Sequence, residues 1–152
     1  MWTAGQLGGA LSLDGSDDYV ATAQAPFDPS VTDFSLAVWF RAGDRGSDEH
    51  LISQVDGTGA GRAWLGNDVS RGVYSFLGRE RTDTLFVPTT GEWHHAVLTR
   101  SGTTVQIYVD GELRVTNGDV RIEPADGGLI LGSNKTATLG HFNGALDDIR
   151  IY

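Results

Sequence analysis

Aromatic rings and planar hydrogen-bonding groups gather in the middle of the sequence, where glycines interrupt the strand patterns. A pyranose ring stacks on an aromatic face while its hydroxyl groups pair with Asn, Asp and Arg, and several arginines would also suit an acidic sugar. The alternative is that the rings belong to the core and the arginines to a solvated surface. Taken together, these residues predict a ligand-binding site lined by Trp64, Asn67, Asp68, Arg71, Tyr74, Arg79 and Arg81, with Arg62 just before it.

Aspartates gather in a turn near the start of the chain and in its final segment. They are Asp14, Asp17, Asp18, Asp147 and Asp148. Ca²⁺ takes about six to eight oxygen ligands from carboxylates and carbonyls in irregular loops. If the two ends of the chain pair, these five residues predict a structural calcium site. The alternative is that the aspartates cap turns through backbone hydrogen bonds.

The four histidines show no metal-binding pattern. His94 and His95 are adjacent on a predicted strand, so they point to opposite faces and cannot share one metal. One of them is expected to be buried with a satisfied hydrogen bond. His50 and His141 lie in predicted loops without a partner at a recognisable spacing.

Composition limits the class of protein. The 152 residues suffice for one domain, 1–152, and the net charge of −9 argues against binding to nucleic acid or anionic lipid. No apolar run approaches the roughly 20 residues that a membrane helix needs, so membrane insertion is not expected. The absence of cysteine excludes disulfides and thiolate chemistry.

The elements that must position these residues are strands. The 21 glycines, four prolines and lack of helical periodicity predict an all-β fold. Residues 91–115 read as two consecutive hairpins, with Asp110-Gly111 as the dipeptide that type I′ turns favour. Their apolar face requires a second sheet to cover it, which predicts a two-sheet antiparallel β-sandwich. The residues that we expect under that sheet are Trp93, Val97, Val105, Ile107 and Val109.

Other strand patterns complete the sandwich. Residues 34–41 form the most apolar run, with Phe34, Leu36, Val38 and Phe40 on the core face and Trp39 opposite. The final segment, 144–152, is expected to pair with the strand at 9–15, which would bring Asp147 or Asp148 near the acidic turn. Further strands are predicted at 19–21, 51–54, 62–67, 72–78, 82–87, 120–122 and 129–132.

Five blocks of sequence stand in a recognisable order: GALSLDGSDDYV, FSLAVWFR, GEWHHAVLTR, VQIYVDGEL and FNGALDDIRIY. With these blocks the chain resembles the laminin G-like, concanavalin A-like jelly-roll domains over residues 9–152. The resemblance implies two curved sheets with adjacent termini, and binding loops at the rim or on the concave face. It also implies an extracellular setting, and relatives commonly hold a structural calcium.

The resemblance does not decide between a catalytic and a binding function. Jelly-roll glycosidases place two Glu and an Asp at alternating positions of one strand, whereas the five glutamates here are scattered. Nucleophile elbows and phosphate-binding loops are also missing. The sequence therefore predicts a protein that is not an enzyme.

The first hypothesis is a carbohydrate-binding accessory module of a larger secreted bacterial protein, whose partner is a polysaccharide or glycan. The chain starts on Met-Trp without an export signal and ends one residue past Ile151, as a module excised from a longer chain would. The alternative is an extracellular adhesion module that binds another protein through an exposed apolar patch. A glycosidase is the third and least favoured reading.

Overall fold

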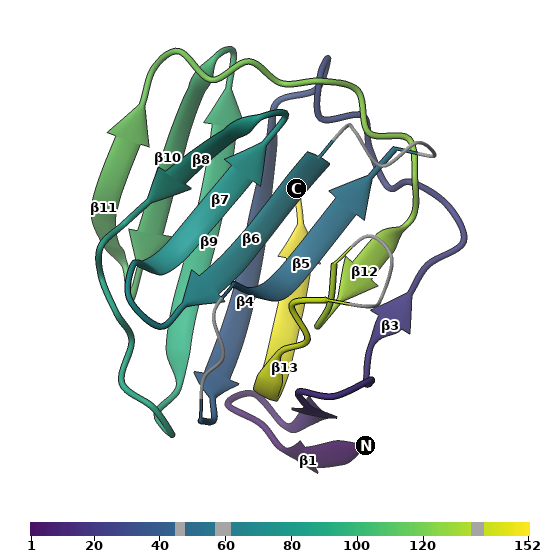
Figure 1. Cartoon of the computed structure of the whole chain (residues 1–152), viewed down its shortest axis with the longest axis vertical. Helices are drawn as coiled ribbons and strands as arrows, with labels where there is room; N and C mark the ends of the chain where they lie inside the picture. Colours follow the sequence, from purple (N-terminus) through teal and green to yellow (C-terminus); the bar gives the residue numbers. More distant parts are fainter. Residues whose placement is uncertain (45–47, 57–61, 135–138) are drawn as a thin grey trace.

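The structure, a computed structural model, describes residues 1–44, 48–56, 62–134 and 139–152, and the regular secondary structure in these ranges is all β-strand. Two antiparallel sheets stack face to face, the six-stranded sheet lying in front of the seven-stranded one in Figure 1. This confirms the predicted sandwich.

The seven-stranded sheet has the order β1 (Trp2–Ala4), β2 (Gly9–Asp14), β13 (Asn143–Ile151), β4 (Phe34–Ala42), β9 (His94–Ser101), β10 (Thr104–Val109) and β11 (Glu112–Asn117). The six-stranded sheet has the order β3 (Val20–Ala21), β12 (Leu129–Leu131), β5 (Glu49–Val55), β6 (Arg62–Asp68), β7 (Gly72–Leu77) and β8 (Glu80–Asp83). Among the described residues, no helix has the length and apolar character that a membrane crossing requires.

The core lies between the sheets because successive strand residues point to opposite faces. Phe34, Leu36, Val38 and Phe40 are each at most 4% exposed, as the sequence predicts. Burying side chains of this size stabilises the fold by about 1.5–3 kcal/mol each. The inward residues of the facing sheet include Leu51, Ile52, Ala63, Leu65, Val73 and Leu77.

The two hairpins of residues 91–115 form as predicted, with β9 paired to β10 and β10 to β11. Asp110 and Gly111 have φ values of 55° and 80°, the positive angles that a type I′ turn requires. One expectation about the faces is wrong. Trp93 and Val97 are only half-buried, because β9 directs its other residues inward, namely His94, Ala96 and Leu98.

The strands near the two ends of the chain pair as predicted, since β13 lies between β2 and β4. Their antiparallel register sets Asp14 opposite Asn143 and Leu11 opposite Leu146. Asp147 is therefore four residues farther along β13 than the partner of Asp14, a separation of about 13 Å at the rise of a strand. The expectation that Asp147 and Asp148 reach the acidic turn is wrong.

Two other strand predictions need correction. Residues 120–122 form no strand, although Val120 is 1% exposed and its N–H donates to the carbonyl of Thr103. An apolar side chain in a connecting segment can thus fill the core without joining a sheet. β8 ends at Asp83 rather than reaching Val87, and Leu85 beyond it has a φ of 58° that a strand cannot accommodate.

Candidate functional site

The outer face of the six-stranded sheet carries a row of side chains across four neighbouring strands. The register sets Ser53 of β5 beside Trp64 of β6, Trp64 beside Phe76 of β7, and Phe76 beside Arg81 of β8. These side chains point outward because the residues between them, such as Leu65 and Leu77, fill the core. The rings of Trp64 and Phe76 lie 5.1 Å apart with an interplanar angle of 54°, and both are half-buried.

A second row runs beside the first, from His50 through Gly66 and Tyr74 to Asp83. Gly66 leaves the space that the ring of Tyr74 occupies. A Cβ atom at position 66 would lie 2.5 Å from the Cζ atom of Tyr74 and 2.7 Å from the carbonyl oxygen of Glu49. The missing side chain lets the phenol ring lie against β6, where it is only 2% exposed.

Arg81 joins the two rows. Its guanidinium lies over the Tyr74 ring, 3.9 Å from the centroid, where a cation is attracted by the π-electrons. Its three nitrogens each donate to a different carboxylate: Nε to Asp83 at 2.6 Å, Nη2 to Asp68 at 3.0 Å, and Nη1 to Asp48. Burial favours the neutral guanidine, but these carboxylates outweigh burial and raise the pKa of Arg81. The guanidinium is therefore a fixed, charged part of the site.

The carboxylate of Asp68 is also fixed by several hydrogen bonds. Its Oδ1 atom accepts hydrogen bonds from the backbone N–H and hydroxyl of Ser70, both at 2.8 Å, and from the N–H of Arg71 at 3.0 Å. Burial disfavours the carboxylate, but the bonds from Ser70, Arg71 and Arg81 outweigh it and lower the pKa of Asp68. Burial, together with the charge of Asp48, raises the pKa of Tyr74, so its phenol keeps its proton.

His50 closes the site on the β5 side. Its ring meets the ring of Trp64 edge-on at 4.5 Å, and its Nδ1 atom lies 3.0 Å from the hydroxyl of Ser53. Gly140, with a φ of 63°, passes so close above the ring that a Cβ atom there would overlap His50. Burial, and secondly the charge of Arg81, lowers the pKa of His50 to about 4. The imidazole is neutral at pH 7.

A pocket of about 370 Å³ opens on this face. We call it the Arg81 pocket, and its lining consists of Asp48, His50, Trp64, Tyr74, Phe76, Arg81, Asn134, Leu139 and Gly140. A volume of this size suits a small-molecule ligand or a short stretch of a polymer. The lining combines aromatic surface with fixed polar groups, which is the combination that sugars require.

The structure brings only part of the predicted ligand site together. Trp64, Tyr74 and Arg81 line the pocket, and Asp68 lies behind Arg81. Arg71 is at the margin, where its Nη1 atom is 3.4 Å from the carboxylate of Asp83.

The remaining predicted residues lie elsewhere. Asn67 points into the interior and is fully buried, because it alternates with the outward Asp68 and Gly66 along β6. Arg79 lies in the turn between β7 and β8 and pairs with Glu123 at 3.2 Å, outside the pocket. The side chain of Arg62 is outside the described residues.

Six lining residues were not predicted from the sequence, namely Asp48, His50, Phe76, Asn134, Leu139 and Gly140. Phe76 stands two positions after Tyr74, so strand alternation alone could have placed both on one face. His50 and Asp48 come from a segment distant in sequence, and only the pairing of β5 with β6 brings them to Trp64. No sequence signal marks that pairing.

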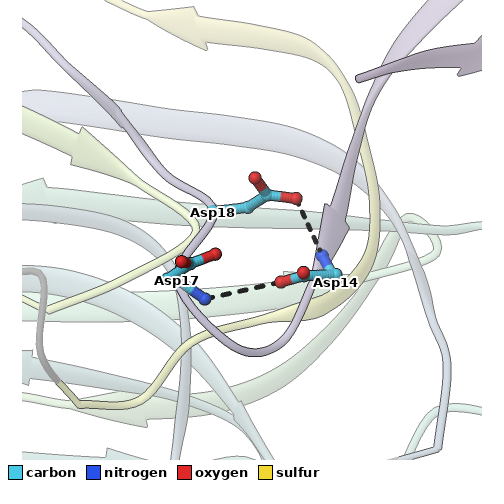
Figure 2. A group of neighbouring side chains, drawn as sticks. All are labelled: Asp14, Asp17 and Asp18. Carbon is cyan, nitrogen blue, oxygen red and sulfur yellow. Dashed lines mark hydrogen bonds between the residues drawn. The ribbon is translucent and has the colours of Figure 1, made fainter.

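The acidic turn gathers three of the five predicted calcium ligands. Asp14, Asp17 and Asp18 each offer an oxygen, and these oxygens lie within 4.8 Å of one another (Figure 2). The Oδ1 atom of Asp14 accepts from the N–H of Ser16 at 2.8 Å and of Asp17 at 3.4 Å, and Asp18 accepts from the N–H of Asp14 at 3.2 Å. The bond from Ser16 is the main cause that lowers the pKa of Asp14.

The other two predicted ligands have different roles. Asp147 is buried and accepts from the N–H of Leu7 at 2.7 Å, which ties the turn after β1 to β13. Asp148 pairs with Arg150 at 2.9 Å. The antiparallel register separates both from the acidic turn.

The adjacent histidines also separate as predicted. His94 is 7% exposed, with its Nδ1 atom 2.8 Å from Asp110 and its Nε2 atom accepting from the N–H of Thr89. His95 lies on the outer face against the ring of Trp39, at 4.9 Å. Trp39 thus faces away from the core, as predicted.

The fold and its pocket together define a class: a two-sheet β-sandwich with an aromatic, charged pocket on one outer face. The family model described as the concanavalin A-like lectin/glucanases superfamily, Laminin_G_3, matches residues 14–152, and the chain belongs to this family. The resemblance stated from the sequence blocks is confirmed. A search of curated protein sequences finds no significant match.

Solved structures share the fold. Domain 4 of AbnA, a GH43 extracellular arabinanase from Geobacillus stearothermophilus in complex with arabinotriose, is 18% identical with a TM-score of 0.77, covering 99% of this chain and 73% of that chain. Domains LG4-5 of mouse laminin α1 are 18% identical with a TM-score of 0.71, covering 97% and 43%. The CBM40 of the Ruminococcus gnavus IT-sialidase is 14% identical with a TM-score of 0.66, covering 89% of both chains. At these identities the likeness establishes the fold alone.

Proposed function

We propose that this chain is a non-catalytic carbohydrate-binding module that acts outside the cell as an accessory of a larger secreted protein. The Arg81 pocket is its glycan site. The observation that carries the proposal is the row of Trp64, Phe76 and Arg81, which sets two rings beside a fixed planar hydrogen-bonding group. A sugar ring stacks on aromatic surface, and its hydroxyl groups pair with polar groups at the edge of that surface.

The comparisons support this proposal through proteins of the same fold. One is a domain of an extracellular arabinanase in complex with arabinotriose, and another is a CBM40 of a sialidase. An accessory module of this kind raises the local concentration of its partner on a polymer without adding a chemical step. The acidic chain gives no support to binding of nucleic acid or anionic membranes.

Removal of the Trp64 ring tests the glycan site. We expect Trp64→Ala to weaken binding by at least about tenfold for any glycan that slows the natural chain in the gel, because a central aromatic contact carries much of the affinity. The measurement is affinity electrophoresis in gels that contain arabinan, galactan, xylan or β-glucan. Trp2→Ala is the matched control, since Trp2 is 77% exposed on β1 and lies outside the pocket. Equal mobility of the two variants in every gel would disprove the assignment.

The charges in the pocket support the non-catalytic part of the proposal. Asp48 is the carboxylate among the described lining residues, and Arg81 binds it together with Asp68 and Asp83. A glycosidase places two carboxyl groups on either side of the scissile bond, whereas Asp68 and Asp83 here are bound to the same guanidinium as Asp48 and do not line the pocket. Release of reducing sugar from any bound glycan by the purified chain would contradict this part.

We also propose that the acidic turn holds a structural calcium ion. The donor set fits, because three carboxylates converge within 4.8 Å in an irregular turn and Ca²⁺ prefers such oxygens. Hydrogen bonds from the turn occupy one oxygen each of Asp14 and Asp18, and every carboxylate has two. Bound calcium would fix the connection between β2 and β3.

Thermal unfolding with calcium or with a chelator tests the ion. An ion that binds only the folded chain stabilises it, by about 2.7 kcal/mol at a concentration 100 times its Kd. We expect calcium to raise the midpoint of the natural chain and to leave Asp17→Asn nearly unchanged. A midpoint that is the same at saturating calcium and in chelator would remove the calcium proposal.

The second candidate function is a protein-binding adhesion module, and one observation favours it. A mostly apolar pocket of about 330 Å³ lies where the sheets meet near β1, lined by Trp2, Leu11, Val20, Leu131, Leu146 and Ile149 among others. Exposed apolar surface of this kind occurs at protein interfaces. If the chain binds none of the glycans in the gels, the result would favour this second function.

A further inference from the structure

The charged groups around the Arg81 pocket leave an excess of negative charge among the described side chains. The carboxylates of Asp48, Asp68 and Asp83 surround the guanidinium of Arg81, and Arg71 adds a second cation at Asp83. Three carboxylates thus face two guanidinium groups. A ligand that brings another carboxylate meets more repulsion than attraction from this set.

The guanidinium of Arg81 already binds three carboxylates. A carboxylate is normally received by two parallel N–H groups along one edge of an arginine. Here Nε, Nη1 and Nη2 donate to three different aspartates, and the ring of Tyr74 covers one face of the group. The side chain is 20% exposed. An acidic sugar would have to compete with these three aspartates for the guanidinium.

No other described side chain of the lining supplies a positive charge. His50 is neutral at pH 7 because burial and Arg81 oppose its protonation. Arg79, which the sequence offered as a partner for an acidic sugar, pairs with Glu123 outside the pocket. What remains for the ligand is aromatic surface from Trp64 and Phe76, with the partly exposed carboxylate of Asp48 at its edge.

We infer that the Arg81 pocket selects neutral glycans and excludes sugars that carry a carboxylate, an inference that rests on the proposed glycan-binding function. In this arrangement Arg81 is a positioning residue. It holds the ring of Tyr74 and orders the carboxylate of Asp48, which lines the pocket and accepts hydrogen bonds from sugar hydroxyl groups. The selectivity comes from the aspartates, which balance the arginine before any ligand arrives.

The test compares polymers that differ only in charge. Polygalacturonate and hyaluronan are each paired with a carboxyl-reduced form, in which the carboxylate is replaced by a hydroxymethyl group, and arabinan and β-glucan complete the set. Affinity for the natural chain is measured at low and at moderate salt. We expect binding to be confined to neutral polymers, with any reduced form bound at least about tenfold more tightly than its acidic parent at low salt.

Variants then assign the selectivity to the pocket. Asp48→Asn removes a carboxylate that is 57% exposed, so it is expected to fold, and Asp48→Asn with Asp83→Asn removes two. We expect the preference for the neutral form to fall several-fold in the single variant and further in the double one. Glu112→Gln is the control, because Glu112 is 71% exposed in an ion pair with Arg114 on the other sheet. It should leave the preference unchanged.

The outcomes are distinct. Tighter binding of an acidic polymer than of its reduced form by the natural chain would overturn the selectivity and leave the glycan site in place. A preference that survives unchanged in a folded Asp48→Asn chain and in the folded double variant would overturn the role of the aspartates. Failure to bind any polymer, charged or neutral, would overturn the proposed function itself.

Discussion

At the scale of single residues, the pocket depends on how charge is balanced around Arg81. One guanidinium contacts a ring and three carboxylates, so substitution of any one partner changes the others. The group is only 20% exposed, and its ion pairs with Asp68 and Asp83 are more shielded than most surface pairs. The order of the pocket therefore comes from a polar network rather than from apolar packing alone.

His50 makes the stability of the folded chain depend on pH. The unfolded chain binds a proton on His50 near pH 6.5, whereas the folded chain resists protonation until about pH 4. The folded state therefore loses stability as the pH falls from 6.5 to 4, by about 3 kcal/mol from this residue. We expect His50→Gln to lose less stability over that range. The measurement is the free energy of unfolding in urea at pH 7, 5.5 and 4.

Part of the loss will remain in the His50→Gln variant, since burial also lowers the pKa of His95. The aspartates with lowered pKa values, such as Asp28 and Asp33, lose most of their contribution below their ordinary value of 3.8. They add only the start of their loss within the chosen range. An identical loss between pH 7 and 4 in the natural chain and the variant would show that His50 does not titrate as described.

The sequence could predict the kind of residue in the pocket but not its full membership. Trp64, Tyr74 and Arg81 share a face because their strands are regular and neighbours along the chain. Asn67 was predicted from its type, yet it occupies an inward position of the same strand. Asp48 and Leu139 reach the pocket from loops, and loop geometry has no periodic signal in the sequence.

At the scale of elements, the pairing of β6 with β7 sets the floor of the pocket. Tyr74 stands opposite Gly66, and its ring covers the gap that the glycine leaves. A larger residue at position 66 would push the ring outward, toward Arg81. The contact between the strands and the polar network above them are thus linked.

Gly66→Ala tests this link. The added Cβ atom would approach both the Tyr74 ring and the carbonyl of Glu49, so we expect a loss of about 1–3 kcal/mol in the free energy of unfolding. We also expect weaker glycan binding, because the ring and Arg81 must move. Gly118→Ala is the control, since nothing lies within 4 Å of a Cβ atom there. Equal stability of the two variants in urea would contradict the described floor.

Sequence patterns predicted the elements best where local chemistry decides them. The hairpins of residues 91–115 form as expected because Asp110-Gly111 specifies its own turn. The burial of Trp93 and Val97 was misjudged, since a strand rich in apolar residues does not reveal which alternate set faces the core. The bulge in β13, where Asp148 adopts a φ of 45°, also has no counterpart in the apolar pattern.

At the scale of the whole molecule, the class of fold could be predicted from the sequence, whereas the site could be predicted only in part. Turn dipeptides, strand alternation and five ordered blocks define the sandwich, and the family match over residues 14–152 confirms it. The site depends on register between distant strands. Antiparallel pairing sets Asp14 against Asn143 and removes Asp147 from the acidic turn, a result that depends on direction and offset rather than composition.

The four tryptophans mark different surfaces of the molecule. Trp64 lines the Arg81 pocket, Trp39 lies on the outer face of the seven-stranded sheet, and Trp2 lies at the apolar pocket near β1. The ring centroid of Trp93 lies 5.1 Å from the guanidinium carbon of Arg41, a residue of β4. Each indole N–H gives its own nuclear magnetic resonance signal, so a ligand can be assigned to one surface in a single titration.

That titration is the most direct measurement of the central claim, which is that this chain binds glycan through the outer face of the six-stranded sheet. The ¹⁵N-labelled chain is titrated with neutral oligosaccharides, including arabinotriose, while the four indole signals are followed. We predict that the Trp64 signal moves and saturates while those of Trp2, Trp39 and Trp93 stay in place. The claim would be contradicted if the signal of Trp39 or Trp2 shifted saturably while that of Trp64 did not. It would also be contradicted if no signal shifted with any oligosaccharide.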